Sequence, residues 1–199
     1  MITIAANGSG TRRRWQGSDA SWRDVSPGIV RQVSRGLSPW LVSTDSLTQR
    51  LVDRCDAGFS VRVLRQAVER PLASESLMLG LPRGRFAFVR QVQLLCGNRP
   101  VVYARTVIPI ETAHTRLKGL TRLGTRPLGA VLFSTPGMRR GKIQLARIDA
   151  KQGLSRLAHR GVDAELCTIW GRRSLFYLYN QPLLVSEIFL SDFPFGYNN

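Results

Sequence analysis

Residues 86–109 read FAFVRQVQLLCGNRPVVYARTVIP, and this stretch decides the fold of the chain. Hydrophobic and polar residues alternate through both halves, and Gly97-Asn98 lies between them. Period-two alternation of β-branched and aromatic residues around a Gly-Asn pair is typical of a β-hairpin. We therefore expect two antiparallel strands here.

Each strand of this hairpin carries one arginine on an otherwise apolar face, Arg90 in the first and Arg105 in the second. With a two-residue loop, Cys96 pairs with Arg99, and Arg90 lies opposite Arg105. A four-residue loop makes the two arginines diagonal neighbours on one face, and only an odd-length loop separates them. Because like charges across a strand pair repel and a guanidinium in an apolar layer is costly, the pattern predicts an anion between them.

The composition is compatible with several classes of function. The chain has 199 residues, of which 43% are hydrophobic, so one domain with a proper core and a tail is expected. The net charge of +16 suits nucleic acid or acidic lipid as a partner, but it equally suits an enzyme that acts on anions.

Cysteine usage and hydropathy predict a cytoplasmic protein. The cysteines are Cys55, Cys96 and Cys167, an odd number without CxxC or Cys/His ligand spacing, which indicates a reducing compartment and no metal site. No apolar stretch approaches the about 18 residues that span a bilayer, so no stable membrane insertion is expected. The N-terminus shows no hydrophobic signal region.

Residues 1–38 are expected to form a flexible basic arm, because their hydrophobic residues are too sparse to build a face. A basic arm can bind nucleic acid, but a solvated extension is the commoner structure. The domain is expected to span residues 39–199.

Short helices and strands are expected on both sides of the hairpin. Ser46-Leu47-Thr48-Gln49 has the form of a capping box and predicts a helix to about Cys55, followed by a strand at residues 59–68. Residues 71–84 read as an irregular connection. After the hairpin, Pro127 suits the first turn of another helix, whose free N–H groups from Leu128 onward suit an anion. His114 has no second histidine or cysteine nearby, so a surface position is expected.

The last predicted strand repeats the charge anomaly of the hairpin. Glu187 shares one face with Leu183, Val185 and Phe189. A buried Arg–Glu ion pair accounts for part of this pattern. Two arginines and one carboxylate still leave surplus positive charge, which favours a site for an anionic ligand.

Five motifs together resemble the chorismate lyase family over about Pro39 to Pro194. In chain order they are Phe88-Val89-Arg90-Gln91-Val92, residues 104–109, residues 123–129 with Leu132-Phe133, Trp170-Gly171-Arg172-Arg173-Ser174, and residues 182–190. The chain departs from the family in its longer arm and in a longer basic insertion at about residues 134–169. That insertion is either a phosphate-binding patch or, more commonly, a solvated face.

The resemblance implies an α+β fold with a single antiparallel β-sheet of about six strands and short helices packed against it. It implies conversion of chorismate to 4-hydroxybenzoate and pyruvate, the first step of ubiquinone biosynthesis, without a metal or organic cofactor. Arg90 would meet the ring carboxylate, helped by the backbone N–H of Leu128, and Glu187 would meet the hydroxyl end. Leu47 would line the pocket, and Arg105 would lie near the enolpyruvyl carboxylate. Arg90 and Glu187 are thus the candidate catalytic residues.

Two other functions are weighed against this one. The same fold resembles the non-catalytic effector domain of bacterial helix-turn-helix repressors, but residues 1–38 show no two-helix pattern with a turn. Specific nucleic-acid binding is not favoured, because the sequence has neither a basic strand with interleaved aromatic residues nor a basic recognition helix. We therefore expect a monomer that binds small molecules.

Overall fold

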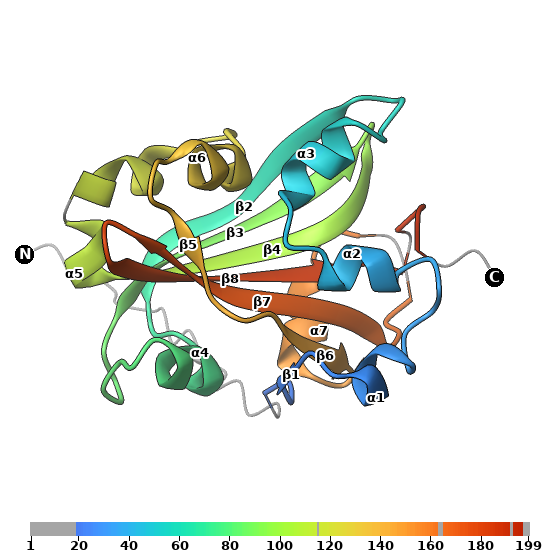
Figure 1. Ribbon diagram of the computed structural model, residues 1–199, viewed down its shortest axis with the longest axis horizontal. Helices are drawn as coiled ribbons and strands as arrows, with labels where there is room; N and C mark the ends of the chain where they lie inside the picture. Colours follow the sequence, from blue (N-terminus) through green and yellow to red (C-terminus); the bar gives the residue numbers. More distant parts are fainter. Residues whose placement is uncertain (1–18, 115, 163–164, 192, 197–199) are drawn as a thin grey trace, which may run out of the picture.

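The computed structural model describes residues 19–114, 116–162, 165–191 and 193–196, and these residues form one antiparallel sheet with short helices on both faces (Figure 1). The strands are β1 (Arg23–Asp24), β2 (Phe59–Glu69), β3 (Ala87–Cys96), β4 (Arg99–Pro109), β5 (Arg139–Arg140), β6 (Gln144–Ile148), β7 (Ile169–Leu178) and β8 (Gln181–Phe189). The helices are α1 (Pro27–Val30), α2 (Ser38–Val42), α3 (Leu47–Val52), α4 (Ala73–Met78), α5 (Ile110–Ala113), the 3-10 helix η1 (Arg116–Arg122), α6 (Leu128–Ser134) and α7 (Gly153–Ala158).

The strand order is β1-β6-β7-β8-β4-β3-β2, and β5 pairs with β7 beside this path. The predicted α+β class is confirmed, with eight strands in place of about six. The short strands β1, β5 and β6 lie in the two regions read as arm and insertion. The predicted hairpin is β3–β4, near the centre of the sheet.

The register of the central hairpin differs from the expected one by a single residue. Cys96 pairs with Arg99 across the two-residue turn, as predicted. The ladder then shifts, because Leu95 pairs with Pro100 whereas Leu94 pairs with Val102. Proline has no N–H to donate to a ladder and is therefore found at bulges, where one strand gains an extra residue.

This bulge places the two hairpin arginines on opposite faces of the sheet. Arg90 pairs with Thr106, and Arg105 pairs with Gln91. The expectation that Arg90 and Arg105 face each other is therefore wrong, although the predicted loop length is right. A shift of one residue moves every later side chain to the other face, because the side-chain period of a strand is two.

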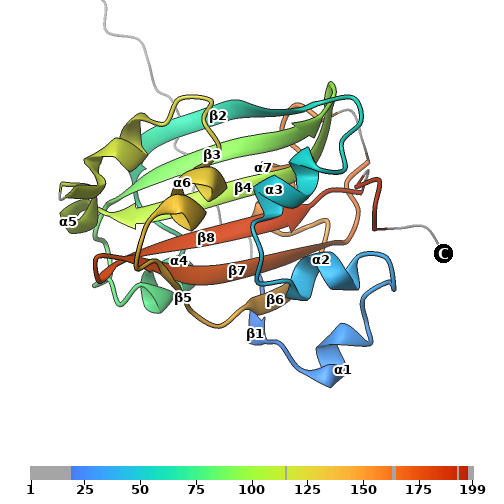
Figure 2. The same ribbon diagram turned by 45° about the horizontal axis from the view of Figure 1, so that its top comes forward.

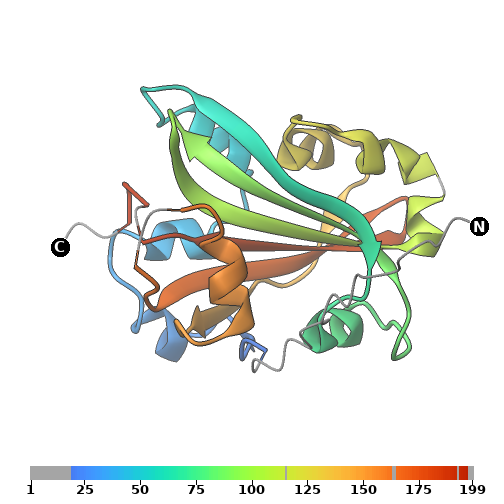
Figure 3. The same cartoon turned by 180° about the vertical axis from the view of Figure 1, so that it is seen from behind.

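We name the two faces of the sheet by the helices that cover them. The near face is covered by α2, α3 and α6 (Figure 2), and its core includes Val92, Phe189 and Leu183. The far face carries α4 and α7 (Figure 3), and its core includes Val89 and Ile188. Functional side chains can therefore be assigned to one face by the parity of their strand positions.

Residues 19–38 belong to the folded domain, so the predicted boundary of the arm at residue 38 is wrong for this part. Ile29, Val33 and Leu37 are buried in the near-face core, and β1 pairs with β6. Spaced four residues apart, these three side chains can fall on one side of a helical path and bury together. Residues 1–18 of the predicted arm lie outside the described residues.

Two other stretches carry more regular structure than expected. Residues 71–84, read as an irregular connection, contain α4, and the insertion contains β5, β6 and α7. The insertion is thus built into the sheet by pairing of β6 with β7, and α7 packs on the far face. The helices and strands in these stretches are each too short to show a periodic pattern that separates them from a loop.

The cysteines only partly follow the prediction. Cys55 and Cys96 form a disulfide that links the segment after α3 to the end of β3, whereas Cys167 is free. The expectation of reduced thiols is therefore wrong for this pair. Within the described ranges, no cluster of three or more His, Cys, Asp or Glu could hold a metal ion, and His114 is exposed as predicted. No helix in the same ranges is long and apolar enough to cross a bilayer.

The segment before Pro39 is expected to contribute to stability. Leu37 is fully buried in the near-face core, so Leu37→Ala should lower the free energy of unfolding by about 2–5 kcal/mol through the lost contacts and the cavity left behind. Urea unfolding of both proteins measures the difference. The exposed Arg31→Ala is the matched control and should stay within about 0.5 kcal/mol of the parent. Equal stability of Leu37→Ala and Arg31→Ala would show that this segment is not part of the core.

Candidate functional site

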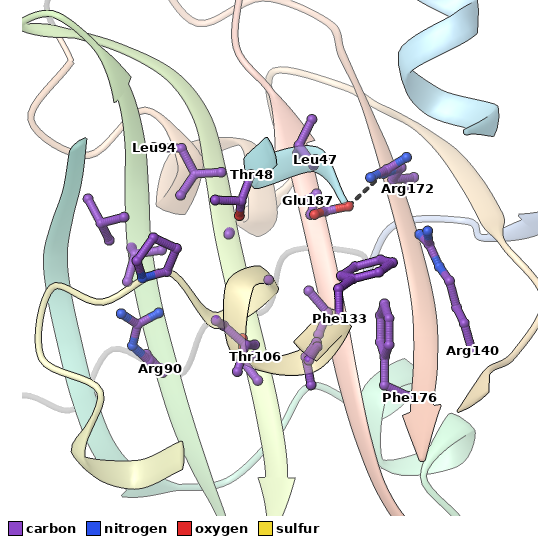
Figure 4. Close-up of a pocket in the computed structure, with 18 of the residues that line it drawn as sticks. Leu47, Thr48, Arg90, Leu94, Thr106, Phe133, Arg140, Arg172, Phe176 and Glu187 are labelled. Atoms are coloured by element: carbon purple, nitrogen blue, oxygen red, sulfur yellow. Dashed lines mark hydrogen bonds and ion pairs between the residues drawn. The ribbon is translucent and has the colours of Figure 1, made fainter. Parts of the chain in front are cut away.

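A pocket lies on the near face of the sheet, between strands β3, β4, β7 and β8 and the helices α3 and α6 (Figure 4). Its polar side chains come from distant parts of the chain and its remaining lining is mostly apolar. The polar and charged lining residues are Asp45, Thr48, Arg90, Thr106, Arg140, Arg172 and Glu187, and the aromatic ones are Phe133 and Phe176. A mostly apolar pocket with a few convergent charged groups is the usual form of a small-molecule site.

Arg90 brings a buried positive charge to this pocket. Only 2% of the residue is exposed, and its Nη2 donates hydrogen bonds to the carbonyl oxygens of Gly124 at 2.8 Å and Arg126 at 3.2 Å. Its Nε is buried without a hydrogen-bond partner among the described residues. Burial lowers the pKa of Arg90, because desolvation disfavours the charged form. No carboxylate in the described part of the chain pairs with it, so the site has an unneutralised cation that suits an anionic ligand.

Glu187 lies on the adjacent part of the pocket and is held by Arg172. The Nε of Arg172 donates to Oε2 of Glu187 at 2.5 Å, and the two residues are partners across the β7–β8 ladder. Nη1 of Arg172 also donates to the carbonyl oxygens of Trp40 at 2.7 Å and Ser43 at 2.8 Å. Arg172 is 1% exposed and its Nε and Nη1 donate to protein groups, so its main effect is to fix the carboxylate of Glu187.

Arg172 was missed as a site residue, although a signal for it was present. The signal was the motif of residues 170–174, which includes Arg172, and the ladder places Arg172 opposite Glu187 because Leu178 pairs with Gln181 across the turn. The buried Arg–Glu ion pair considered from the sequence therefore exists, but with Arg172 as the cation. Arg90 is not part of this ion pair.

Arg140 is the third arginine of the pocket and was also missed. Its Nε donates to Oγ of Ser174 at 3.1 Å, and its Nη1 donates to the carbonyl oxygen of Thr44 at 2.9 Å. Burial, and then the nearby charge of Arg172, lower the pKa of Arg140 to about 10. It still carries its charge at neutral pH, so the pocket holds more guanidinium groups than carboxylates.

Arg105 does not line this pocket, contrary to its proposed position near the enolpyruvyl carboxylate. On the far face its Nε lies 2.7 Å from Oε1 of Glu75, and its Nη1 lies 3.2 Å from Oε1 of Glu69. Burial opposes its charge, but the two carboxylates outweigh this effect and raise the pKa of Arg105. The bulge in β4 is the reason, because it turns position 105 away from position 90.

The other predicted residues of the site meet on the near face. Leu47 and Leu128 begin α3 and α6, and both line the pocket together with Arg90 and Glu187. The Ser46 side chain accepts a hydrogen bond from the N–H of Gln49, as the capping box predicted. Four of the five residues expected at the site are therefore brought together, and Arg105 is the exception.

The two covering helices touch through a glycine. A Cβ added at Gly129 of α6 would lie 2.6 Å from Oγ1 and 3.2 Å from Cβ of Thr48 in α3, so only glycine allows this approach. The enclosed space is about 40 Å³, far below the roughly 300 Å³ at the lower end of ordinary ligand pockets. The pocket is therefore nearly closed in this structure, and α3 and α6 are the helices that cover it (Figure 4).

The family comparison and the curated relatives point to the same family. The family described as Chorismate lyase matches residues 17–196. A protein named "Probable chorismate pyruvate-lyase" from Azoarcus sp. (strain BH72) is 42% identical over 177 residues, which cover 87% of this chain and 92% of that protein. A protein of the same name from Thiobacillus denitrificans is 42% identical over 80% of this chain and 84% of its own length.

Solved structures with the same fold are distant in sequence. PhnF from Mycobacterium smegmatis superposes with a TM-score of 0.52 at 13% identity, covering 76% of this chain and 66% of that protein. At this identity the likeness concerns the fold alone.

The contact at Gly129 is expected to control how tightly the pocket closes. Gly129→Ala should push α6 away from Thr48 and speed dissociation of 4-hydroxybenzoate, the product implied by the sequence resemblance, by several-fold. Stopped-flow displacement measures the rate. Gly119→Ala is the matched control, since a Cβ there meets nothing within 4 Å. An unchanged dissociation rate in Gly129→Ala would mean that α3 and α6 do not form the gate.

Proposed function

Because this chain belongs to the chorismate lyase family, whose enzymes break a carbon–oxygen bond, we propose that it eliminates pyruvate from chorismate and releases 4-hydroxybenzoate. It would act as a cytoplasmic monomer at the first step of ubiquinone biosynthesis. The observation that carries the proposal is the near-face pocket, where Arg90, Arg140 and Arg172 are set against two carboxylates, the half-buried Glu187 and the exposed Asp45. A pocket with surplus guanidinium groups suits a substrate with two carboxylates.

Each end of the substrate has a candidate partner in this pocket. Arg90 would bind the ring carboxylate, with help from the backbone N–H of Leu128, because its charge has no carboxylate partner among the described residues. Glu187 would accept a hydrogen bond from the ring hydroxyl, and Arg172 would keep the Glu187 carboxylate in place. Leu47 and Phe176 supply apolar surface for the ring.

We assign the enolpyruvyl carboxylate to Arg140 in place of Arg105. Arg140 lines the same pocket as Arg90, whereas the charge of Arg105 is already neutralised by Glu75 and Glu69 on the other face. The Nη2 of Arg140 makes no hydrogen bond to any described residue, so one side of its guanidinium is free for a ligand. A substrate lying along the near face from Arg90 towards Arg140 would pass Glu187 (Figure 4).

The main task of the protein in this reaction is to position the substrate. The C–H bond at the hydroxyl-bearing carbon breaks, its electron pair becomes part of the aromatic ring, and the ether electron pair leaves with the pyruvate enolate, which then takes up a proton. Glu187 can accept the departing proton or can orient the hydroxyl while the proton transfers within the substrate. Arg140 can stabilise the negative charge that develops on the leaving group, and the covered pocket strengthens that interaction by excluding water.

A second candidate function is ligand sensing without catalysis, which the fold also supports. The presence of Glu187 and Arg90 in one pocket favours the enzyme, because a sensor for an anion needs no carboxylate beside the hydroxyl. The absorbance of purified protein mixed with chorismate distinguishes the two, since a sensor leaves the spectrum unchanged.

Arg90 and Glu187 are expected to have separable effects on binding and turnover. Arg90→Ala should weaken binding of chorismate and of 4-hydroxybenzoate by about 2–5 kcal/mol, the usual cost of truncating one partner of a buried charge pair. If Glu187 is the base, Glu187→Gln should lower turnover roughly 10²–10⁴-fold with a modest change in product affinity. If it only orients the hydroxyl, Glu187→Ala should be the more severe variant. Product titration and single-turnover rates measure both quantities, and parental values in Arg90→Ala would remove this pocket as the active site.

Arg140 is expected to distinguish substrate from product. Arg140→Ala should weaken chorismate binding on the order of tenfold or more, because a charged hydrogen bond is lost, and should leave 4-hydroxybenzoate affinity within about twofold. Equilibrium titration of both ligands tests this. The neighbouring Arg139→Ala is the control, since Arg139 contacts Asn180 and Tyr177 outside the pocket. Equal losses for both ligands in Arg140→Ala would place its effect on the fold of the pocket and not on the second carboxylate.

A further inference from the structure

The far face of the sheet carries a second and larger cavity. It has a volume of about 750 Å³, and it is lined from β2, β3 and β4, from the segment that enters α4, and from α7 of the insertion. Figure 3 shows α4 and α7 on this face of the sheet, opposite the face covered by α3 and α6. The sheet separates it from the near-face pocket, and the two cavities share no lining residue.

The floor of the far-face cavity is a preformed polar network in which the charge of Arg105 is already neutralised. Arg105 is ion-paired with Glu75 and Glu69, and Glu69 also accepts a hydrogen bond from Gln91 at 3.2 Å. Gln91 in turn accepts a hydrogen bond from the hydroxyl of Tyr103 at 3.0 Å. A network of this kind holds the floor rigid but offers a ligand no free charge.

The rim of the cavity carries three arginines of a different kind. Arg70, Arg156 and Arg160 line the cavity, and none of them forms an ion pair within the described part of the chain. All three are exposed, so their guanidinium groups are accessible. The backbone of Arg160 is nevertheless fixed, since its carbonyl oxygen accepts a hydrogen bond from Gln93 Nε2 at 3.0 Å.

The carboxylates that line the cavity do not neutralise this rim. Glu69 is shared between Arg65 and Arg105, at 3.0 Å and 3.2 Å respectively. The Asp19 carboxylate accepts hydrogen bonds from the backbone N–H of Ser74 and of Ala20. The rim therefore keeps a surplus positive charge beside an enclosed space.

The walls between floor and rim are apolar. Leu72 stands on the α4 side, and Leu154 and Leu157 stand on the α7 side. The volume falls within the roughly 300–1,000 Å³ of ordinary ligand pockets. An anionic head at the rim and an apolar body against the leucines would satisfy both parts of the lining.

We propose that the far-face cavity binds an organic phosphate with an apolar body, which is held by Arg70, Arg156 and Arg160 and packed against Leu154 and Leu157. Guanidinium groups bind phosphate oxygens through paired N–H donors, and three of them suit a dianion better than a single carboxylate. The phosphate can belong to a free molecule or to a lipid headgroup. This site is independent of the reaction assigned to the near face.

Hexyl phosphate is a suitable probe, with inorganic phosphate and hexanol as its two separated halves. Isothermal titration should show hexyl phosphate binding at least about tenfold more tightly than either half, because the cavity contacts both parts at once. Arg156→Glu with Arg160→Glu should weaken hexyl phosphate binding at least tenfold. Arg31→Glu with Arg35→Glu makes the same change in net charge at exposed positions that do not line the cavity, and should leave binding within about twofold.

Two further measurements locate the site and the source of the phosphate. Arg90→Ala should leave hexyl phosphate binding unchanged, since Arg90 lies on the near face. Flotation with phosphatidylcholine vesicles containing phosphatidic acid distinguishes a lipid headgroup from a free phosphate: retention that depends on Arg156 and Arg160 assigns the lipid, and its absence assigns a free molecule. Equal losses in the rim and control variants, or loss of binding in Arg90→Ala, would overturn the proposal.

Discussion

The one-residue bulge in β4 is the constraint on which both polar regions of the molecule depend. Pro100 interrupts the ladder beside the turn, so Arg90 and Arg105 point to opposite faces of the same hairpin. On the near face Arg90 is held by backbone carbonyl oxygens alone, whereas on the far face Arg105 is neutralised by two carboxylates. A buried cation with no carboxylate partner in the described chain suits a ligand, and a paired one supports the fold.

The buried arginines of the near face differ in what they contact. Arg172 uses its donors on Glu187 and on two backbone carbonyl oxygens, and this fixes a carboxylate inside a mostly apolar pocket. Arg90 and Arg140 are desolvated, and burial lowers the pKa of both. An anion bound beside these two guanidinium groups would offset that desolvation cost, and exclusion of water by the covering helices α3 and α6 would strengthen the interaction.

The basic insertion is part of the folded domain. Its β6 extends the sheet and its α7 covers part of the far face, so it is more than a solvated extension. The same segment also supplies Arg156 and Arg160 to the rim of the far-face cavity. Leu154 and Ala158 of α7 are buried against the sheet, whereas Arg156 on the helix and Arg160 in the turn after it are exposed.

The sequence by itself determined the hairpin, the antiparallel sheet, the capped helix at Leu47 and the choice of Arg90 and Glu187, which line one pocket. Those features follow from local alternation, turn residues and motif order, which act over a few residues. Only the tertiary structure decided that Arg105 serves the far face, that Arg140 and Arg172 enter the pocket, and that Ile29 to Leu37 join the core. These outcomes depend on a bulge, on cross-strand partners and on packing between segments far apart in the chain. The charge and periodicity of one strand cannot predict which face a side chain occupies, because a single-residue shift in register exchanges the two faces of a sheet.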